Sequence, residues 1–312
     1  MNSPAYASQP GESSSWQFET AGGSRIQSAD SISESRSQAN VLVQVWRTFN
    51  NAIMISVNHG PATEMPGATT YAEPQVVFSS QNGPTSLFWV FHTGTNGYVF
   101  YTPVSATPNS QTYTPQGLWN QVPNGVATPN ELRVSVIPLP RQNLFLSFRG
   151  ASSNEIWTIF FDGSRWANPT IVPGARSPRT GMVAIGGEIG LGGDSFRNVI
   201  ILAWTGTDRR ANVIRQTYGQ STWRNHEILG DMLGDDTIVA MSGTGRGQIG
   251  LSHNNRVSLA TINEDSGWDG TWSQESTAHV AYHFNLFAYA AAVYLVTAYG
   301  NGYVDWKQSR QF

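Results

Sequence analysis

The sequence contains no cysteine, which excludes a disulfide framework and any thiolate nucleophile. Charged residues make up only 12% of the chain, and Lys307 is the single lysine. The net charge of −3 leaves no basic footprint of the kind that binds nucleic acid. No apolar run reaches the length of a membrane span, and the start of the chain lacks a secretory leader pattern. We therefore expect a soluble protein, cytoplasmic or secreted without a standard signal peptide, that inserts into no membrane.

Glycine, proline and aromatic residues are plentiful instead. The 31 glycines, 16 prolines and 12% aromatic residues favour many turns and many short strands. A chain of 312 residues accommodates two ordinary domains or one large all-β domain, and it is long enough to bury a sizeable core.

One pattern recurs along the chain: an apolar strand, a short turn rich in Gly, Asn, Asp or Arg, and a second strand. It is clearest in LAWTGTDRRANVIRQTYGQSTW, residues 202–223. Similar hairpins begin at Val41, Ser86, Asn143, Val199, Gln248 and Val293. Their turn centres recur every ~45–57 residues, the spacing of four-stranded propeller blades.

The segments between the hairpins supply the remaining strands. Short apolar runs such as QVVFSS (75–80) and TIVAMSG (237–243) precede the hairpins, and a tryptophan with a further short strand follows several of them. The last unit lacks its fourth strand, and SSSWQFETAGG (13–23) has the form of the missing piece. These features predict one all-β domain, a six-bladed β-propeller of four-stranded antiparallel blades closed by an N-terminal strand. The expected blades are roughly 24–70, 71–127, 128–176, 177–235, 236–277, and 278–312 together with 13–23, after a disordered tail at 1–12.

Aligning the six hairpins brings one position into register just after the second strand, together with the position just before it. An aromatic residue often occupies the earlier position and a planar hydrogen-bond donor the later one. An aromatic face beside a planar donor suits sugar binding, and repeated weak sites would act by avidity. The competing interpretation is that these residues support the turns and that the tryptophans after the third strands are framework. The candidate ligand-binding residues are Trp46, Arg47, Phe91, His92, Phe148, Arg149, Trp204, Thr205, His253 and Tyr299.

Two segments carry a resemblance to known proteins. IWTIFFDGSRW (156–166) resembles the recurring strand–DGS–W segment of fungal fucose-binding lectins of the orange-peel mushroom type, which are six-bladed propellers. Residues 202–223 are similar to repeats of bacterial and fungal propeller lectins and to the sialidase Asp-box. The resemblance implies a propeller fold and fucose binding. Those lectins place an Arg on one strand and a Glu on the next in most blades. Here Arg133, Arg149 and Arg215 are scattered and Glu155 falls in a turn, so the sequence does not show that pair.

Catalytic and metal-binding motifs are weak in this sequence. It contains no GxSxG, no phosphate-binding loop and no HExxH. HVAYH (279–283) has a helical metal spacing within a strand-rich region, where the two side chains would not converge. GDMLGDD (230–236) and NEDSGWDG (263–270) are dense in acids but match no calcium loop, which favours solvated turns. We expect no metal site, no cofactor and no catalytic residue.

The sequence as a whole favours a non-enzymatic carbohydrate-binding lectin with several shallow sugar sites at blade junctions. A glycoside hydrolase of sialidase-like build is the alternative, and a propeller scaffold for protein interaction is the third. The expected partners are glycans, with nucleic acid excluded and a homodimer left open.

Overall fold

A computed structural model describes residues 17–19, 32–139, 142–179, 182–186, 199–241, 246–254, 256–263, 267–275, 281–289, 292–299 and 304–311. Throughout these ranges the regular elements are β-strands, numbered β1 to β26, with no α-helix among them. A search of the same ranges finds no helix that could cross a membrane. The tail expected at residues 1–12 lies outside them.

The described strands form six antiparallel sheets, here called blades 1 to 6. The first three blades follow the order of the chain. Blade 1 contains β2 (Ser33–Arg36), β3 (Leu42–Arg47), β4 (Ala52–Val57) and β5 (Thr63–Thr69). Blade 2 contains β6 (Gln75–Asn82), β7 (Thr85–Thr93), β8 (Val99–Ala106), β9 (Thr114–Pro115) and β10 (Asn120–Gln121). Blade 3 contains β11 (Ser135–Pro138), β12 (Leu144–Arg149), β13 (Glu155–Phe161) and β14 (Thr170–Arg176).

The other three blades continue in the same way, and the last one includes the beginning of the chain. Blade 4 contains β15 (Met182–Gly186), β16 (Val199–Thr205), β17 (Arg210–Thr217) and β18 (Trp223–Leu233). Blade 5 contains β19 (Asp236–Met241), β20 (Arg246–His253), β21 (Arg256–Asn263), β22 (Gly267–Trp268) and β23 (Ser273–Glu275). Blade 6 contains β24 (Ala281–Tyr289), β25 (Ala292–Tyr299), β26 (Val304–Gln311) and β1 (Gln17–Glu19).

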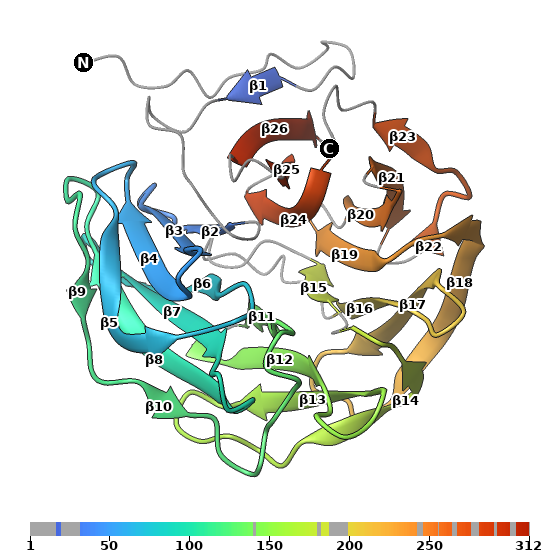
Figure 1. Cartoon of the computed structure of the whole chain (residues 1–312), viewed down its shortest axis with the longest axis horizontal. Coiled ribbons are helices and arrows are strands. Elements are labelled where there is room, and N and C mark those ends of the chain that lie inside the picture. Colours follow the sequence, from blue (N-terminus) through green and yellow to red (C-terminus); the bar gives the residue numbers. More distant parts are fainter. Residues whose placement is uncertain are drawn as a thin grey trace.

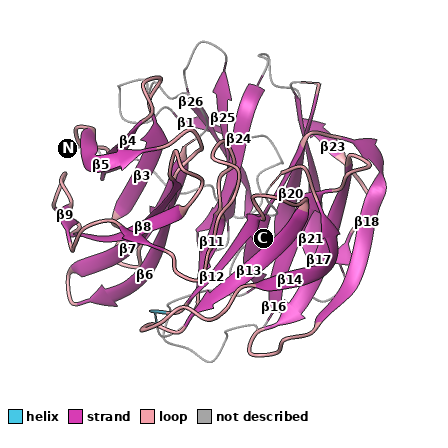
Figure 2. Cartoon of the chain, turned by 60° about the horizontal axis from the view of Figure 1, so that its bottom comes forward, coloured by secondary structure: helices cyan, strands magenta, loops and turns pink. Residues whose placement is uncertain are grey.

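The first strands of the blades contact one another in a closed ring, in the order β2, β6, β11, β15, β19, β24 and back to β2. They surround the centre of the molecule in Figure 1, with the later strands of each blade further out. Figure 2 shows the sheets from a second direction, joined by loops and turns. The all-β, six-bladed propeller predicted from the hairpin repeat is confirmed.

Blade 6 is completed by the N-terminal strand. β1 pairs antiparallel with β26, so that Gln17 lies opposite Gln308 and Glu19 opposite Trp306. The predicted closure by an N-terminal strand is therefore confirmed. Because the first and last segments of the chain share one sheet, blade 6 has no unpaired third strand, and the ring is held together by backbone hydrogen bonds.

The core consists of apolar layers between neighbouring blades. Separate clusters of buried side chains join blades 1 and 2, blades 2 and 3, blades 3 and 4, and blades 4 to 6. Inner strands such as β16 are buried on both faces, which is why VIILAW, the part of the strand before Thr205, is apolar and does not alternate with polar residues. Outer strands such as β14 are largely exposed.

The tryptophans that follow the third strands pack against the preceding blade. The indole Nε1 of Trp119 donates to the carbonyl of Pro66 in blade 1 at 3.1 Å, and that of Trp272 donates to Leu229 in blade 4 at 3.1 Å. Trp166 meets the ring of Tyr101 in blade 2 at 5.6 Å, and Trp223 meets Phe145 in blade 3 at 6.2 Å. Their interpretation as framework between blades is confirmed.

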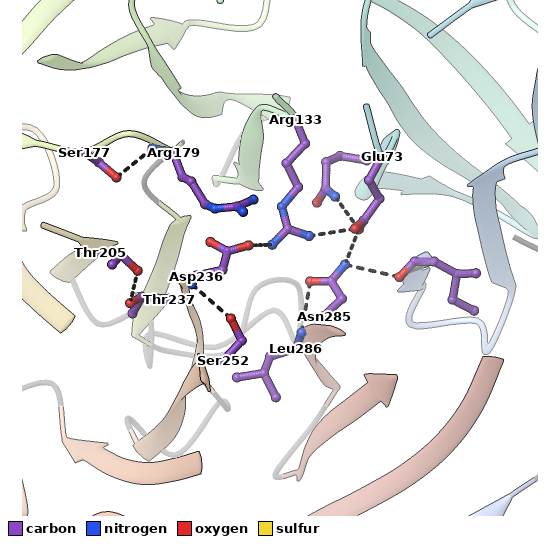
Figure 3. Close-up of polar contacts among 12 residues, drawn as sticks. Glu73, Arg133, Ser177, Arg179, Thr205, Asp236, Thr237, Ser252, Asn285 and Leu286 are labelled. Atoms are coloured by element: carbon purple, nitrogen blue, oxygen red, sulfur yellow. Dashed lines mark hydrogen bonds and ion pairs between the residues drawn. The ribbon is translucent and has the colours of Figure 1, made fainter. Parts of the chain in front are cut away.

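Buried polar side chains from several blades meet at the axis (Figure 3). The Glu73 carboxylate accepts from Arg133 at 2.8 Å, from Asn285 at 2.9 Å and from Gln75 at 3.0 Å. Arg133 also reaches Asp236 at 3.5 Å, and Asn285 donates to the carbonyl of Ile32 at 3.2 Å. Through these contacts, residues of blades 2, 3, 5 and 6 and the chain entering blade 1 are tied together across the centre. We call this set of contacts the axial network.

Candidate functional site

The structure places the candidate residues inferred from the sequence at the ends of second strands, beside the turns to the third strands. Their aromatic side chains lie in the core. Trp46 is 5% exposed, Phe91 0%, Phe148 3% and Trp204 2%. Rings buried in this way contact protein on both faces, so they offer no face for a sugar to stack on in this conformation.

The planar donors beside these rings bind their own turns. Arg47 donates to the side chain of Asn51 at 2.8 Å, and Arg149 donates to that of Asn154 at 3.0 Å. His253 Nε2 lies 2.8 Å from the Ser258 hydroxyl. Arg47, Arg149 and His253 are half-buried, so part of each side chain remains accessible.

The other three candidate donors differ from these. His92 is 4% exposed and lies against the rings of Phe100 and Trp119, at 5.4 and 4.6 Å. Burial lowers the pKa of His92 to about 4, so its imidazole is neutral near pH 7. Thr205 is buried and shares a hydroxyl hydrogen bond of 2.8 Å with Thr237 of blade 5. Tyr299 ends β25, where the structure describes only its backbone.

An Arg–Glu pair that the sequence did not reveal lies where blade 4 meets blade 5. Arg215 on β17 and Glu227 on β18 are 2.6 Å apart between guanidinium Nη1 and carboxylate Oε1. The Arg215 side chain is 4% exposed, whereas that of Glu227 is 37% exposed. The pairing needs the register of the β17–β18 hairpin, which places Glu227 opposite Val213. The sequence expectation that Arg215 is an isolated arginine is therefore corrected.

Arg215 keeps hydrogen-bond donors that no described residue satisfies. Its Nε and Nη2 atoms are buried without an acceptor, and so is the indole Nε1 of Trp268 on the neighbouring blade. An unsatisfied buried donor costs ~1–3 kcal/mol, more when it is charged. These three unsatisfied donors lie at the junction of blades 4 and 5.

Glycine lets the two blades approach closely at this junction. A Cβ at Gly267 would lie 2.9 Å from both Glu227 carboxylate oxygens and 3.0 Å from Arg215 Nη2, and the φ of +87° there also favours glycine. At Gly230, which bulges from β18, a Cβ would lie 3.0 Å from the ring of Trp268. The rings of Trp268 and Trp272 are 6.2 Å apart and both are half-buried. We call Arg215, Glu227, Trp268 and the two glycines the 4–5 junction site.

The corresponding positions of blades 1 and 3 do not hold this combination. In blade 3, Phe160 and Thr170 occupy the register positions of Arg215 and Glu227, and in blade 1 Val57 and Thr63 do so. Blade 3 has an Arg–Glu contact elsewhere, between Arg176 and Glu155 at 3.8 Å, but its arginine is 69% exposed. That exposed pair is a matched surface counterpart of the buried Arg215–Glu227 pair.

The DGS segment that carried the resemblance is a turn device. The Asp162 carboxylate accepts the backbone N–H groups of Arg165 and Ser164, both at 2.9 Å. These hydrogen bonds, with the Ser164 hydroxyl, hold the pKa of Asp162 well below its usual range. The turn leads directly into Trp166, which packs against blade 2. The segment therefore sets the position of a framework tryptophan.

The first acidic segment contains ion pairs. Asp231 lies within β18 and pairs with Arg210 at 3.3 Å, and Asp235 lies in the turn to β19 and pairs with Arg209 at 2.8 Å, both on the solvent-exposed surface. Within the described ranges, no three His, Asp or Glu side chains converge as metal ligands would. His279 lies outside these ranges, and only the backbone of His283 is described.

Known proteins resemble this chain in fold but not in sequence. No family model and no curated protein sequence matches the chain. The Aleuria aurantia lectin in complex with Fucα1-6GlcNAc is 10% identical, with a TM-score of 0.63 over 91% of this chain and 93% of that one. SapL1 lectin with α-methyl fucoside is 10% identical, with a TM-score of 0.60 over 92% and 95%. A putative oxidoreductase (glucose dehydrogenase) of Thermus thermophilus is also 10% identical, with a TM-score of 0.57 over 94% and 99%. The Aleuria lectin is a six-bladed propeller, which is the architecture found here.

Proposed function

We propose that this protein is a carbohydrate-binding lectin and that the 4–5 junction site holds a neutral sugar. The observation that carries the proposal is the buried Arg215 guanidinium, which has two unsatisfied N–H groups beside the half-exposed Glu227 carboxylate. A guanidinium only donates hydrogen bonds and a carboxylate only accepts them. A sugar that enters the junction can satisfy both groups, with one hydroxyl accepting from Arg215 and an adjacent hydroxyl donating to Glu227.

Electrostatics and shape support a neutral ligand. Arg215 and Glu227 together carry no net charge, so the site does not select for an anion or a cation. The half-buried indole of Trp268 supplies an apolar surface for the C–H face of a sugar, and its unsatisfied N–H supplies a further donor. The two similar lectins contain fucosides, so fucose is the first sugar to test.

The exposed parts of Arg47, Arg149 and His253 remain proposed contacts for additional, weaker sites. Each offers a planar donor near the solvent. The rings that precede Arg47 and Arg149 are buried, and Ser252 precedes His253, so these sites offer hydrogen bonding without stacking. Such sites would add avidity when several act on one glycan surface, while the 4–5 junction site supplies most of the affinity.

The test is binding of L-fucose and of a glycan array to Glu227→Gln, with Glu155→Gln as its matched control. Glu227→Gln removes the charged acceptor at the buried pair, and Glu155→Gln makes the same change at the exposed pair. We expect glycan affinity to fall about tenfold or more in Glu227→Gln, because a charge-assisted hydrogen bond is lost, and to be unchanged in Glu155→Gln.

Two outcomes would overturn the proposal. One is a wild-type protein that binds no glycan on the array. The other is steady turnover of a fluorogenic glycoside by the wild-type protein, which would establish the hydrolase alternative.

A further inference from the structure

Residues before or within the first strands of the six blades place a ring of polar groups around the axis. In blade order the ring comprises the Ile32 carbonyl, Glu73, Arg133, Arg179, Asp236 and Asn285. Arg179 precedes β15, between the positions of Arg133 before β11 and Asp236 at the start of β19. Since β15 contacts both β11 and β19, the topology places the Arg179 backbone next to these two residues around the axis.

Two members of the ring neutralise each other. Arg133 is 10% exposed and Glu73 6%, and they are joined at 2.8 Å. The second oxygen of Glu73 accepts from Asn285 and Gln75. Both charges are therefore fixed in position.

Arg179 and Asp236 are left open to a ligand. The Arg179 residue is exposed, and its guanidinium has no hydrogen bond or ion pair in the described structure. The Asp236 carboxylate is 25% exposed, and its single contact, with Arg133, is 3.5 Å long. Figure 3 shows the Arg179 side chain extending toward the Arg133 guanidinium and the Asp236 carboxylate.

We propose that Arg179 and Asp236, beside the axial network, form a second ligand site, the axial site, which binds a neutral polyhydroxy ligand of the monosaccharide class. The proposal rests on the sugar-binding function proposed above. Arg179 donates and Asp236 accepts, so a vicinal diol satisfies both. An anion would be attracted by Arg179 but repelled by Asp236, and a cation would be attracted by Asp236 but repelled by Arg179. An uncharged ligand therefore fits best.

The experiment uses the full chain with the 4–5 junction site disabled by Arg215→Met and Glu227→Gln. Binding of a panel of neutral methyl glycosides (fucoside, galactoside, glucoside and mannoside) is measured by isothermal titration and saturation-transfer NMR. Glucuronate and glucosamine serve as charged probes. Into this background we introduce Arg179→Gln, with Arg165→Gln as the control at another exposed arginine.

We expect the background protein to bind at least one neutral glycoside and neither charged probe, and Arg179→Gln to weaken that binding about tenfold or more while Arg165→Gln leaves it unchanged. A wild type that binds while the background does not would overturn the axial site and leave the junction site standing. Equal binding by the Arg179→Gln and Arg165→Gln proteins would also overturn the axial site. A background that binds as tightly as wild type, with all binding lost on Arg179→Gln, would support the axial site and reject the junction site. A wild type that binds no sugar would reject both.

Discussion

Replacing Arg133 with methionine removes the cation that neutralises Glu73 in the axial network. Glu73, whose side chain is 6% exposed, would keep its hydrogen bonds from Asn285 and Gln75 but would lose its ion pair with Arg133. Removing one partner of a buried pair costs about 3–5 kcal/mol, because the desolvated charge that remains is uncompensated. This is a large share of the ~5–15 kcal/mol by which domains are usually stable.

The assay is urea unfolding followed by tryptophan fluorescence, with thermal unfolding as a second measurement. We expect Arg133→Met to lower the unfolding free energy by about 4 kcal/mol and the melting temperature by roughly 10 °C. The matched control is Arg209→Gln, which breaks an ion pair whose partners are 56% and 53% exposed. It should cost under about 1 kcal/mol because water screens that pair.

A double variant separates charge from packing. Adding Glu73→Gln to Arg133→Met removes the uncompensated charge and should restore at least about 1 kcal/mol. If Arg133→Met unfolds at the same urea concentration as Arg209→Gln, the axial network does not stabilise the ring of blades. If Glu73→Gln restores nothing, the loss arises from packing rather than from charge.

Deletion of residues 1–12 should leave the melting temperature unchanged, whereas deletion of residues 1–22 should lower it sharply, because β1 contributes backbone hydrogen bonds of ~1 kcal/mol each to β26. Equal melting temperatures for the two truncations would contradict closure by β1. Gly230→Ala should lower both stability and fucose affinity, because the added Cβ would lie 3.0 Å from Trp268. Gly174 has a similar positive φ, and nothing lies within 4 Å of a Cβ there, so Gly174→Ala should lower stability alone. Equal fucose affinity of the two glycine variants would count against the 4–5 junction site. The pKa of His92 is about 4 in the folded protein and 6.5 for the free side chain. Between these two pH values the unfolded state therefore binds more protons than the folded state. Up to about 3 kcal/mol of stability should be lost as pH falls from 6.5 to 4. In His92→Gln that part of the pH dependence should disappear from urea midpoints, and an unchanged profile would show that other groups cause it.

Local pattern was enough to predict the blades. Each strand–turn–strand unit and the tryptophan after it occupy neighbouring positions in the sequence. Any other strand register would expose all the apolar side chains of a strand face to water. The missing fourth strand of the last unit likewise predicted that residues near Phe18 pair with residues near Lys307, which the structure bears out. These features depend on short-range geometry and on hydrophobic burial, which a sequence displays directly.

The orientation of side chains at the strand ends could not be settled in the same way. Trp46 and Trp204 are adjacent to polar residues in the sequence, so the sequence is equally consistent with rings that stack on a sugar and with rings in the core. The structure buries both, because each blade is covered on both faces by its neighbours. An alternating pattern distinguishes the core face of a sheet only when the other face is solvated, and in the inner strands of a propeller it is not.

The contacts among polar side chains, in the 4–5 junction site and in the axial network, depend on tertiary structure alone. Arg215 meets Glu227 only after a bulge has set the register of β17 and β18, and Gly267 then brings Trp268 of the next blade close to them. Arg133 and Asp236 are 103 residues apart, and Asn285 and Ile32 are 253 apart. The sequence by itself determined the repeated blade and its closure, since these follow from hydrophobic period and turn chemistry. Which charges face one another depends on the ring that brings distant blades to one axis, and a linear pattern carries no measure of that distance.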